Sequence, residues 1–214
     1  MEDYNEANTR FLLTDGGWAG LVLDSERANI TRIRQSPLYW RYRLKAEQAW
    51  ITRENVNQVI VEHGINGEIG CLSIDIDGND WWVWDAVSTV DPIVVAIEYN
   101  WRFGPDRSVT VPYEPEFDRS RAHPSWLYFG ASLVALERLG ERKGYALVAT
   151  SSSGVNAFFV RHDMLTNDIP IRTARELWRP GRYSECRDET GNLIKLSNDE
   201  QIELLQSLPV VEVE

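Results

Sequence analysis

The chain has 214 residues, of which 43% are hydrophobic and 26% charged, and this suits one large domain with a substantial core. Its 33 acidic and 22 basic side chains give a net charge of -11, which repels phosphate backbones and argues against a nucleic-acid or anionic-membrane binder. No apolar run approaches the roughly 20 residues that cross a bilayer, and the acidic start is unlike a secretion signal, so we expect a soluble, cytoplasmic protein.

Apolar and amphipathic stretches alternate through the first third of the chain. Short apolar runs between turn signals predict strands, and apolar side chains at helical spacing predict helices. In chain order we expect a helix containing Thr9 to Leu12, a strand at Gly20 to Asp24, a helix from Ser25 to Gln35, a strand near Leu44 to Thr52, a helix from Glu54 to His63 and a strand from Ile69 to Asp75. This rhythm is typical of a parallel α/β sheet.

The alternation continues through the middle of the chain. A helix begins at Asn79 or Asp80, and a strongly apolar strand follows at Ile93 to Glu98. The apolar side chains of that helix are Trp81, Trp84, Val87 and Val90. The segment from Tyr99 to Ser125 is far longer than an ordinary connection, and such loops usually serve function. A helix from Trp126 to Lys143 is predicted to follow it.

The last two predicted strands lie too close together for a parallel crossover. Tyr145 to Thr150 and Val155 to Arg161 are separated by a short turn, so we expect them to pair antiparallel. The predicted fold is therefore α/β, a Rossmann-like doubly wound mixed sheet that is mostly parallel and ends in an antiparallel hairpin. We expect one domain over residues 1–179 and a polar extension over 180–214 with a short helix at Asp199 to Leu208. Packing on the sheet, covering an edge and self-association remain open for that extension.

Carboxylates gather where the central strands end. Asp75, Asp77 and Asp80 follow one apolar strand, and Glu98 and Asn100 end the next. Open α/β sheets bind ligands at the carboxyl ends of their strands, and oxygen ligands suit a hard cation such as Mg²⁺ or the hydroxyls of a ligand. The predicted metal ligands are Asp75, Asp77, Glu98 and Asn100. The competing interpretation assigns Asn79 and Asp80 to helix capping and leaves Asp75 as a hydrogen-bonded carboxylate.

Five segments carry a resemblance to a known family. They are Gly17 to Asp24, Glu54 to Asn57, Leu72 to Asp80, Glu98 to Asn100 and Asn156 to Arg161. In this order and spacing they resemble the FkbM-like class I S-adenosylmethionine-dependent methyltransferase family, over roughly Asn8 to Asp163. The resemblance implies S-adenosylmethionine as cofactor and O-methylation of a hydroxyl on a small molecule or glycan.

The resemblance also implies roles for individual residues. Asp24 would hold the cofactor ribose, Asn55 would contact its adenosine end, and Asp75 would border the same pocket. Asp24 and Asn55 are equally suited to helix capping. Asp75 and Asp77 would act in catalysis with Mg²⁺, which lowers the pKa of the substrate hydroxyl. His123, in the long loop, is a candidate general base, although each histidine of the chain also suits a structural role.

The chain departs from that family at its beginning. Class I methyltransferases start with an apolar strand and a glycine-rich turn, whereas residues 1–8 contain no Gly and no apolar run. The first strand would lie between the strands at Gly20 to Asp24 and Ile69 to Asp75. Either the chain is a shortened version of a longer protein, or these neighbours close directly, or a partner chain or second copy supplies the strand, since dry unpaired backbone groups are costly.

Two other functions remain open. The missing glycine-rich turn favours a non-catalytic binding protein or pseudoenzyme of the same fold. Asp75-Ile-Asp77 after an apolar strand also matches the acid-any-acid arrangement with which glycosyltransferases bind a metal and a nucleotide-sugar diphosphate. Cys71 and Cys186 are expected to be separate reduced thiols.

Overall fold

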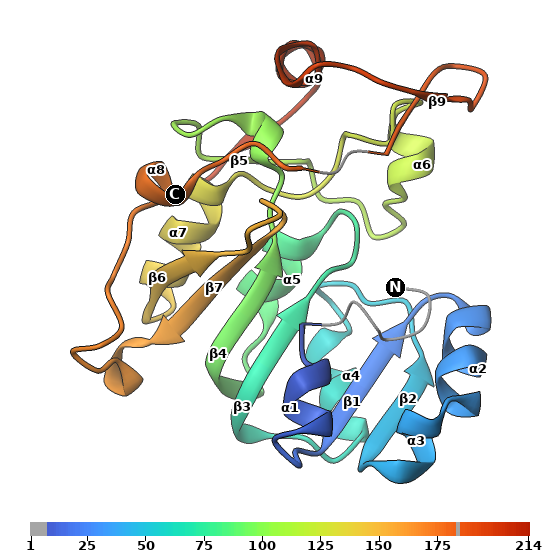
Figure 1. Cartoon of the computed structure of the whole chain (residues 1–214), viewed down its shortest axis with the longest axis vertical. Coiled ribbons are helices and arrows are strands. Elements are labelled where there is room, and N and C mark those ends of the chain that lie inside the picture. The colour runs from blue at the N-terminus through green and yellow to red at the C-terminus, as the bar shows by residue number, and fades with distance from the viewer. Residues whose placement is uncertain (1–7, 183–184) are drawn as a thin grey trace.

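The protein is a mixed α/β structure built around a four-stranded sheet (Figure 1). A computed structural model describes residues 8–182 and 185–214. The four strands lie in the order β3 (Gly67–Ile74), β4 (Val90–Glu98), β7 (Asn156–Arg161) and β6 (Tyr145–Thr150). β3 and β4 are parallel, β7 runs antiparallel to β4, and β6 runs antiparallel to β7. The predicted parallel strands and antiparallel hairpin are therefore confirmed.

The first strands of the chain form a separate parallel pair beside this sheet. The pair consists of β1 (Gly20–Asp24) and β2 (Leu44–Gln48), in register from Gly20 with Leu44 to Asp24 with Gln48. Three short helices accompany it, α1 (Arg10–Thr14), α2 (Arg27–Gln35) and α3 (Pro37–Arg41). Leu13, Ile30 and Ile33 from these helices pack with Leu44 and Ala46 of β2 in one buried cluster. This pair thus has a small core of its own.

Helices α4 (Val56–Glu62), α5 (Asp80–Ala86) and α7 (Leu133–Arg142) cover the four-stranded sheet. Trp84 of α5 and Leu136 of α7 pack against Val95 of β4 and Phe159 of β7, and all four are almost completely buried. Val56 of α4 belongs to a second cluster that joins α4 to α5 and β3. These contacts hold in place the carboxyl ends of β3 and β4, where the acidic residues lie.

The long loop and the C-terminal tail fold together above the ends of the central strands (Figure 1). The loop contains η1 (Trp101–Phe103), β5 (Val109–Thr110) and α6 (Arg119–Ala122). The hairpin is followed by η2 (His162–Met164), α8 (Ala174–Leu177), β8 (Cys186–Arg187), β9 (Leu193–Ile194), α9 (Asn198–Gln206) and β10 (Val211–Glu212). β10 pairs antiparallel with β5, and Arg102 Nε donates to Gln201 Oε1 over 2.8 Å. The described residues of the extension predicted at 180–214 therefore pack on the loop, an arrangement that was not among those left open by the sequence.

The helix expected from Trp126 begins seven residues later than predicted, at Leu133. Trp126 and Gly130 both have positive φ, 61° and 65°, which a right-handed helix does not contain. The Ser132 side chain instead accepts a hydrogen bond from the Ala135 N–H and caps the helix. Leu127 to Phe129, just before the helix, are buried in a cluster formed by the long loop and the C-terminal tail, which we call the loop cluster. Their side chains are apolar because they pack in this cluster and not because they belong to a helix.

Two further boundaries differ from prediction. β2 ends at Gln48, short of Thr52, and α5 ends at Ala86, so that Val90 already belongs to β4. Within the described residues β1 and β3 do not pair, so direct closure, one of the three alternatives for the missing strand, is wrong.

Other sequence expectations have simple outcomes. Cys71 and Cys186 are both free thiols, as predicted. In the part of the chain that the structure describes, no helix has the length and apolar character needed to span a membrane.

Gly140 offers a test of the packing between α7 and the sheet. A Cβ built there lies 2.8 Å from two ring carbons of Phe159 and 3.2 Å from Trp84. We expect Gly140→Ala to lower the free energy of unfolding by about 1–2 kcal/mol in urea denaturation, because overpacking outweighs the roughly 1 kcal/mol of helix propensity that Ala adds. Arg138→Ala on the exposed face of α7 is the control, expected within about 0.5 kcal/mol of wild type. An unchanged or raised stability of Gly140→Ala would contradict this packing.

Candidate functional site

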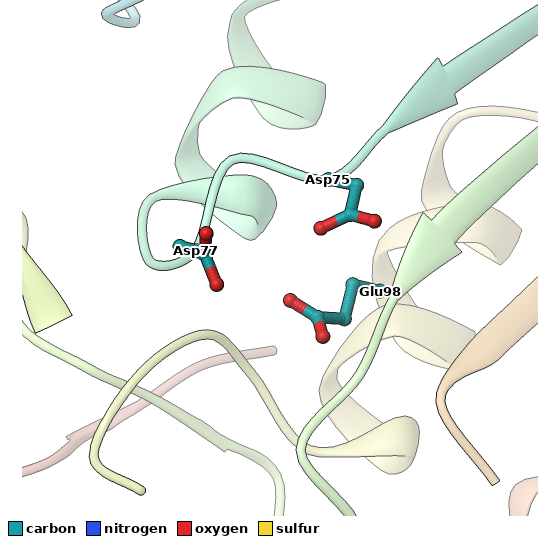
Figure 2. A group of neighbouring side chains, drawn as sticks. All are labelled: Asp75, Asp77 and Glu98. Carbon is teal, nitrogen blue, oxygen red and sulfur yellow. The ribbon is translucent and has the colours of Figure 1, made fainter. Parts of the chain in front are cut away.

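Three carboxylates converge at the carboxyl end of the β3–β4 pair. Asp75 directly follows β3, Asp77 lies in the turn after it, and Glu98 is the last residue of β4 (Figure 2). One oxygen from each lies within 4.8 Å of the others. The side chains point toward a common space between the two strand ends (Figure 2). The sequence prediction that Asp75, Asp77 and Glu98 meet is confirmed.

Asp80 shapes the turn that presents two of these carboxylates. Its Oδ1 accepts the Ile76 N–H and its Oδ2 accepts the Gly78 N–H, each over 3.0 Å, and its side chain is fully buried. Asp77 has a φ of 57°, in the left-handed region that L residues seldom occupy. The Asp80 bonds thus hold a tight turn that sends Asp75 and Asp77 to one side.

Burial and mutual repulsion make the cluster hard to ionise. Loss of hydration, followed by the charges of Asp75, Asp80 and Asp77, raises the pKa of Glu98 well above its usual value. Loss of hydration and the charge of Asp77 likewise raise the pKa of Asp75. One side of the Asp75 side chain is exposed to solvent, and protein surrounds the rest. Burial raises the pKa of Asp80 to about 7 against its two backbone hydrogen bonds. A proton or a cation is needed to compensate this charge.

Arg119 is the cluster's nearest counterion. It forms an ion pair with Asp77 Oδ1, and its charge lowers the pKa of both Asp75 and Glu98. Arg119 begins the short helix α6 in the long loop, and its guanidinium lies 4.8 Å from the centre of the Phe129 ring. Asp77 is 58% exposed in side-chain area, so this pair is open to exchange with other cations.

Buried oxygens without hydrogen-bond partners mark the same region. Within the described residues, Glu98 Oε2, Asn156 Oδ1 and Asn79 Oδ1 are inaccessible to solvent and accept no hydrogen bond. Glu98 and Asn156 are directly opposed on β4 and β7, so their side chains project from the same face. Buried acceptors are nearly always satisfied, and their clustering here indicates a site for a bound donor or ion.

Asn100 is part of the scaffold. Its Nδ2 donates to the carbonyl oxygens of Leu127 and Phe129 over 2.8 and 2.9 Å, and its Oδ1 accepts two bonds from Arg102. The oxygen predicted to be a metal ligand is therefore already engaged, and we remove Asn100 from the candidate ligands. Its role is to anchor the long loop above the strand ends.

Replacing Asn100 tests that anchor. We expect Asn100→Ala to lower the free energy of unfolding by roughly 2–4 kcal/mol, since two buried carbonyls lose their donor. Chemical denaturation measures the loss, with Asn167→Ala at an exposed position as the control. A loss below about 1 kcal/mol would mean that the loop does not depend on this side chain.

Asp24 shares a cavity with the acidic cluster. A cavity of about 210 Å³ is lined by Asp24, Asp75, Asp77, Trp50 and Asn79, and it joins the end of β1 to the end of β3. Both Asp24 oxygens accept hydrogen bonds, from the Glu26 N–H over 2.7 Å and from Asn29 Nδ2 over 3.1 Å. Asp24 thus stabilises the start of α2 while facing the cavity, and its ribose role stays a prediction.

The other two predicted residues lie apart from the carboxylates. Asn55 accepts the Thr52 N–H and donates to the Trp50 carbonyl, which is a local turn contact, and it does not line the cavity. His123 Nδ1 lies 2.8 Å from Ser125 Oγ, and burial lowers the pKa of the imidazole. Its catalytic role is still a prediction.

Sequence reasoning missed three members of the site. Arg119 and Asn156 join this region only when distant segments meet, whereas the turn-forming role of Asp80 depends on its own neighbours Ile76 and Gly78. The local signal for Asp80 was its place two residues after Gly78, where a carboxylate can bond back to the turn. No local pattern distinguishes Arg119 or Asn156 from other polar residues.

Compared with protein-family models, curated proteins and solved structures, the chain gives no match.

Proposed function

We propose that the chain is a Rossmann-like, methyltransferase-like domain whose acidic pocket binds a divalent cation together with the hydroxyl of a small-molecule or glycan ligand. The spatial order of the strands supports the fold part of the proposal. Across the molecule the strands lie in the order β2, β1, β3, β4, β7 and β6 (Figure 1), and β7 lies antiparallel between β4 and β6. A reversed penultimate position of this kind matches the class I methyltransferase sheet without its first strand.

The observation that carries the functional part is the convergence of Asp75, Asp77 and Glu98 around a buried, unsatisfied Glu98 Oε2. These three carboxylates would hold Mg²⁺ or Mn²⁺, and the cation would supply the Lewis acidity that lowers the pKa of a ligand hydroxyl. Burial raises the pKa of the Asp75 and Glu98 carboxyls, which favours proton uptake, as a general base requires. Arg119 would balance Asp77 until a ligand enters.

The fit to S-adenosylmethionine is incomplete. The cavity beside Asp24 measures about 210 Å³, below the roughly 300–1,000 Å³ of typical cofactor pockets. Both oxygens of Asp24 are engaged, and the described residues offer no glycine-rich turn between β1 and the strand ends. We therefore derive no methyl-transfer step from these residues. Only the order of the strands favours methyl transfer as the reaction.

Thermal unfolding with separate ligands tests the proposal. At about 100 times the dissociation constant, Mg²⁺ or Mn²⁺ should raise the midpoint by about 5–10 °C, because the ligand binds only the native state. Ca²⁺ and Na⁺ wells distinguish a site from general ionic-strength effects. No shift at millimolar Mg²⁺ or Mn²⁺ would end the cation proposal. A further rise with S-adenosylmethionine supports methyl transfer, whereas one restricted to a UDP-sugar with Mn²⁺ would replace it by glycosyl transfer.

A further inference from the structure

An apolar cavity lies between β1 and β3. It measures about 740 Å³ and is lined mainly by apolar side chains of β1, β3, α4 and α5. Leu21, Val56, Ile69 and Val83 are among them. We call this space the interstrand groove. It is distinct from the acidic cluster, although its upper end reaches Asp75.

Each wall of the interstrand groove is the open edge of a parallel strand pair. β1 pairs only with β2, and β3 pairs only with β4, within residues 8–182 and 185–214. β1 and β3 run in the same direction (Figure 1). The facing edges therefore present backbone N–H and C=O groups to an otherwise apolar space. An apolar small molecule leaves such groups unsatisfied, whereas an extended peptide pairs with both edges.

The volume of the groove is comparable with that of one short strand. A strand within a sheet occupies about 4.8 Å between neighbours, about 10 Å between layers and about 3.3 Å per residue, so the cavity of about 740 Å³ corresponds to about five residues. β1 itself is five residues long. The Trp18 side chain lies in the groove against β3, and a Cβ built on Gly70 would be 2.1 Å from the nearest atom of its ring.

Charged residues at the two ends of the groove favour a particular charge pattern in an occupant that runs parallel to β1 and β3. Arg43 and Lys45 lie where the parallel strands begin, and Asp24 and Asp75 lie where they end. A segment running parallel to β1 and β3 would place its first residues near the cations and its last near the carboxylates. Complementarity therefore favours an acidic residue before the apolar stretch and a basic residue after it.

No described segment of this chain suits that role. The described strands are already paired. We propose that the interstrand groove binds an extended segment of a partner polypeptide, of about five apolar residues flanked by an acidic and a basic residue, which inserts as a parallel strand between β1 and β3. This inference does not depend on cation binding. The inserted segment would end beside Asp75 and Asp24 and so enlarge the wall of the acidic pocket.

Amide hydrogen exchange tests the insertion directly. The probe is a synthetic peptide with one Asp, five residues drawn from Val, Ile and Gly, and one Lys. In the protein alone, the groove-facing amides of β1 and β3 should exchange fast, while β4, paired on both sides, supplies protected amides as an internal standard. Adding the peptide should slow the groove-facing amides by at least about tenfold.

Two controls make the result specific. The same peptide with two central prolines cannot donate to both edges and should give no protection. Leu21→Glu places a charge in the groove and should abolish protection by the original peptide, whereas Leu193→Glu, at a position 68% exposed in the tail, should not. If Leu21→Glu lowers stability, the proline peptide on the wild-type protein still decides the question.

Three outcomes overturn the inference. Groove-facing amides already protected in the protein alone would mean that the edges are closed. Protection that rises with protein concentration, alongside dimers in sedimentation, would assign the groove to a second copy. Fast exchange that the peptide leaves unchanged would show that the groove does not accept a strand. None of these results bears on Mg²⁺ binding, so the two proposals fail independently.

Discussion

Glu98→Gln should weaken Mg²⁺ and Mn²⁺ binding by about 100-fold or more in calorimetric titration. The substitution keeps the shape of the side chain but removes the charge of the most enclosed carboxylate, whose Oε2 has no partner among the described residues. Divalent cations of this class depend on carboxylate charge, and losing even supporting groups typically costs 10-fold to 100-fold in affinity. Asp75→Asn should act in the same direction, since Asp75 contributes a second oxygen to the same space.

A matched substitution separates this effect from the general acidity of the protein. Glu68→Gln removes one negative charge from β3 near its other end, where Glu68 pairs with Arg161 and is 62% exposed. Its titration should match wild type within about twofold. Equal loss in Glu68→Gln and Glu98→Gln would show that binding is nonspecific. Unchanged affinity in Glu98→Gln would remove this carboxylate from the site.

Without cations, the protein should become less stable as the pH rises from 4 to 8. Burial and repulsion raise the folded-state pKa of Glu98, Asp75 and Asp80, so the folded chain binds more protons than the unfolded chain in this range. The stabilisation is complete below the unfolded values near 4 and is lost as pH passes the folded values. For Asp80, a rise from 3.8 to about 7 corresponds to a loss on the order of 4 kcal/mol. Urea unfolding in a chelator at several pH values measures it.

Both the Glu98→Gln substitution and the bound cation should weaken this pH dependence. Glu98→Gln removes one of the ionising groups, so its stability should fall less between pH 4 and 8 than that of wild type. Saturating Mg²⁺ should stabilise wild type more at pH 8 than at pH 5, because the cation binds the deprotonated carboxylates. Stability that rises with pH in chelator would contradict the raised pKa values, since the folded state would then bind fewer protons.

Where local pattern carries the information, sequence and structure agree. The apolar strand from Ile69 and the acidic residues after it appear as predicted, because strand periodicity and strand ends are properties of neighbouring residues. The hairpin of β6 and β7 follows from the four residues between them, which allow no parallel crossover. Convergence of Asp75 with Glu98 followed from two parallel strands ending at one edge.

Where the environment decides, the sequence prediction failed. Trp126 to Gly130 look like the first turn of an apolar helix, but the side chains of Leu127 to Phe129 pack into the loop cluster. The positive φ of Trp126 and Gly130 is incompatible with a right-handed helix. Asn100 looks like a ligand by its position after β4, yet the loop carbonyls of Leu127 and Phe129 engage its side chain. In both cases a partner distant in sequence competes with the local preference, and tertiary packing prevails.

The sequence by itself determined the alternation of strands and helices, the antiparallel hairpin and the position of Asp75, Asp77 and Glu98 at a strand edge. Only the tertiary structure decided that Arg119 balances Asp77 and that the edges of β1 and β3 stay apart within the described residues. The physical reason is the separation along the chain of the residues that interact. Periodicity, turns and strand ends are fixed by residues a few positions apart, whereas counterions and edge pairing depend on which distant segments the folded core brings together.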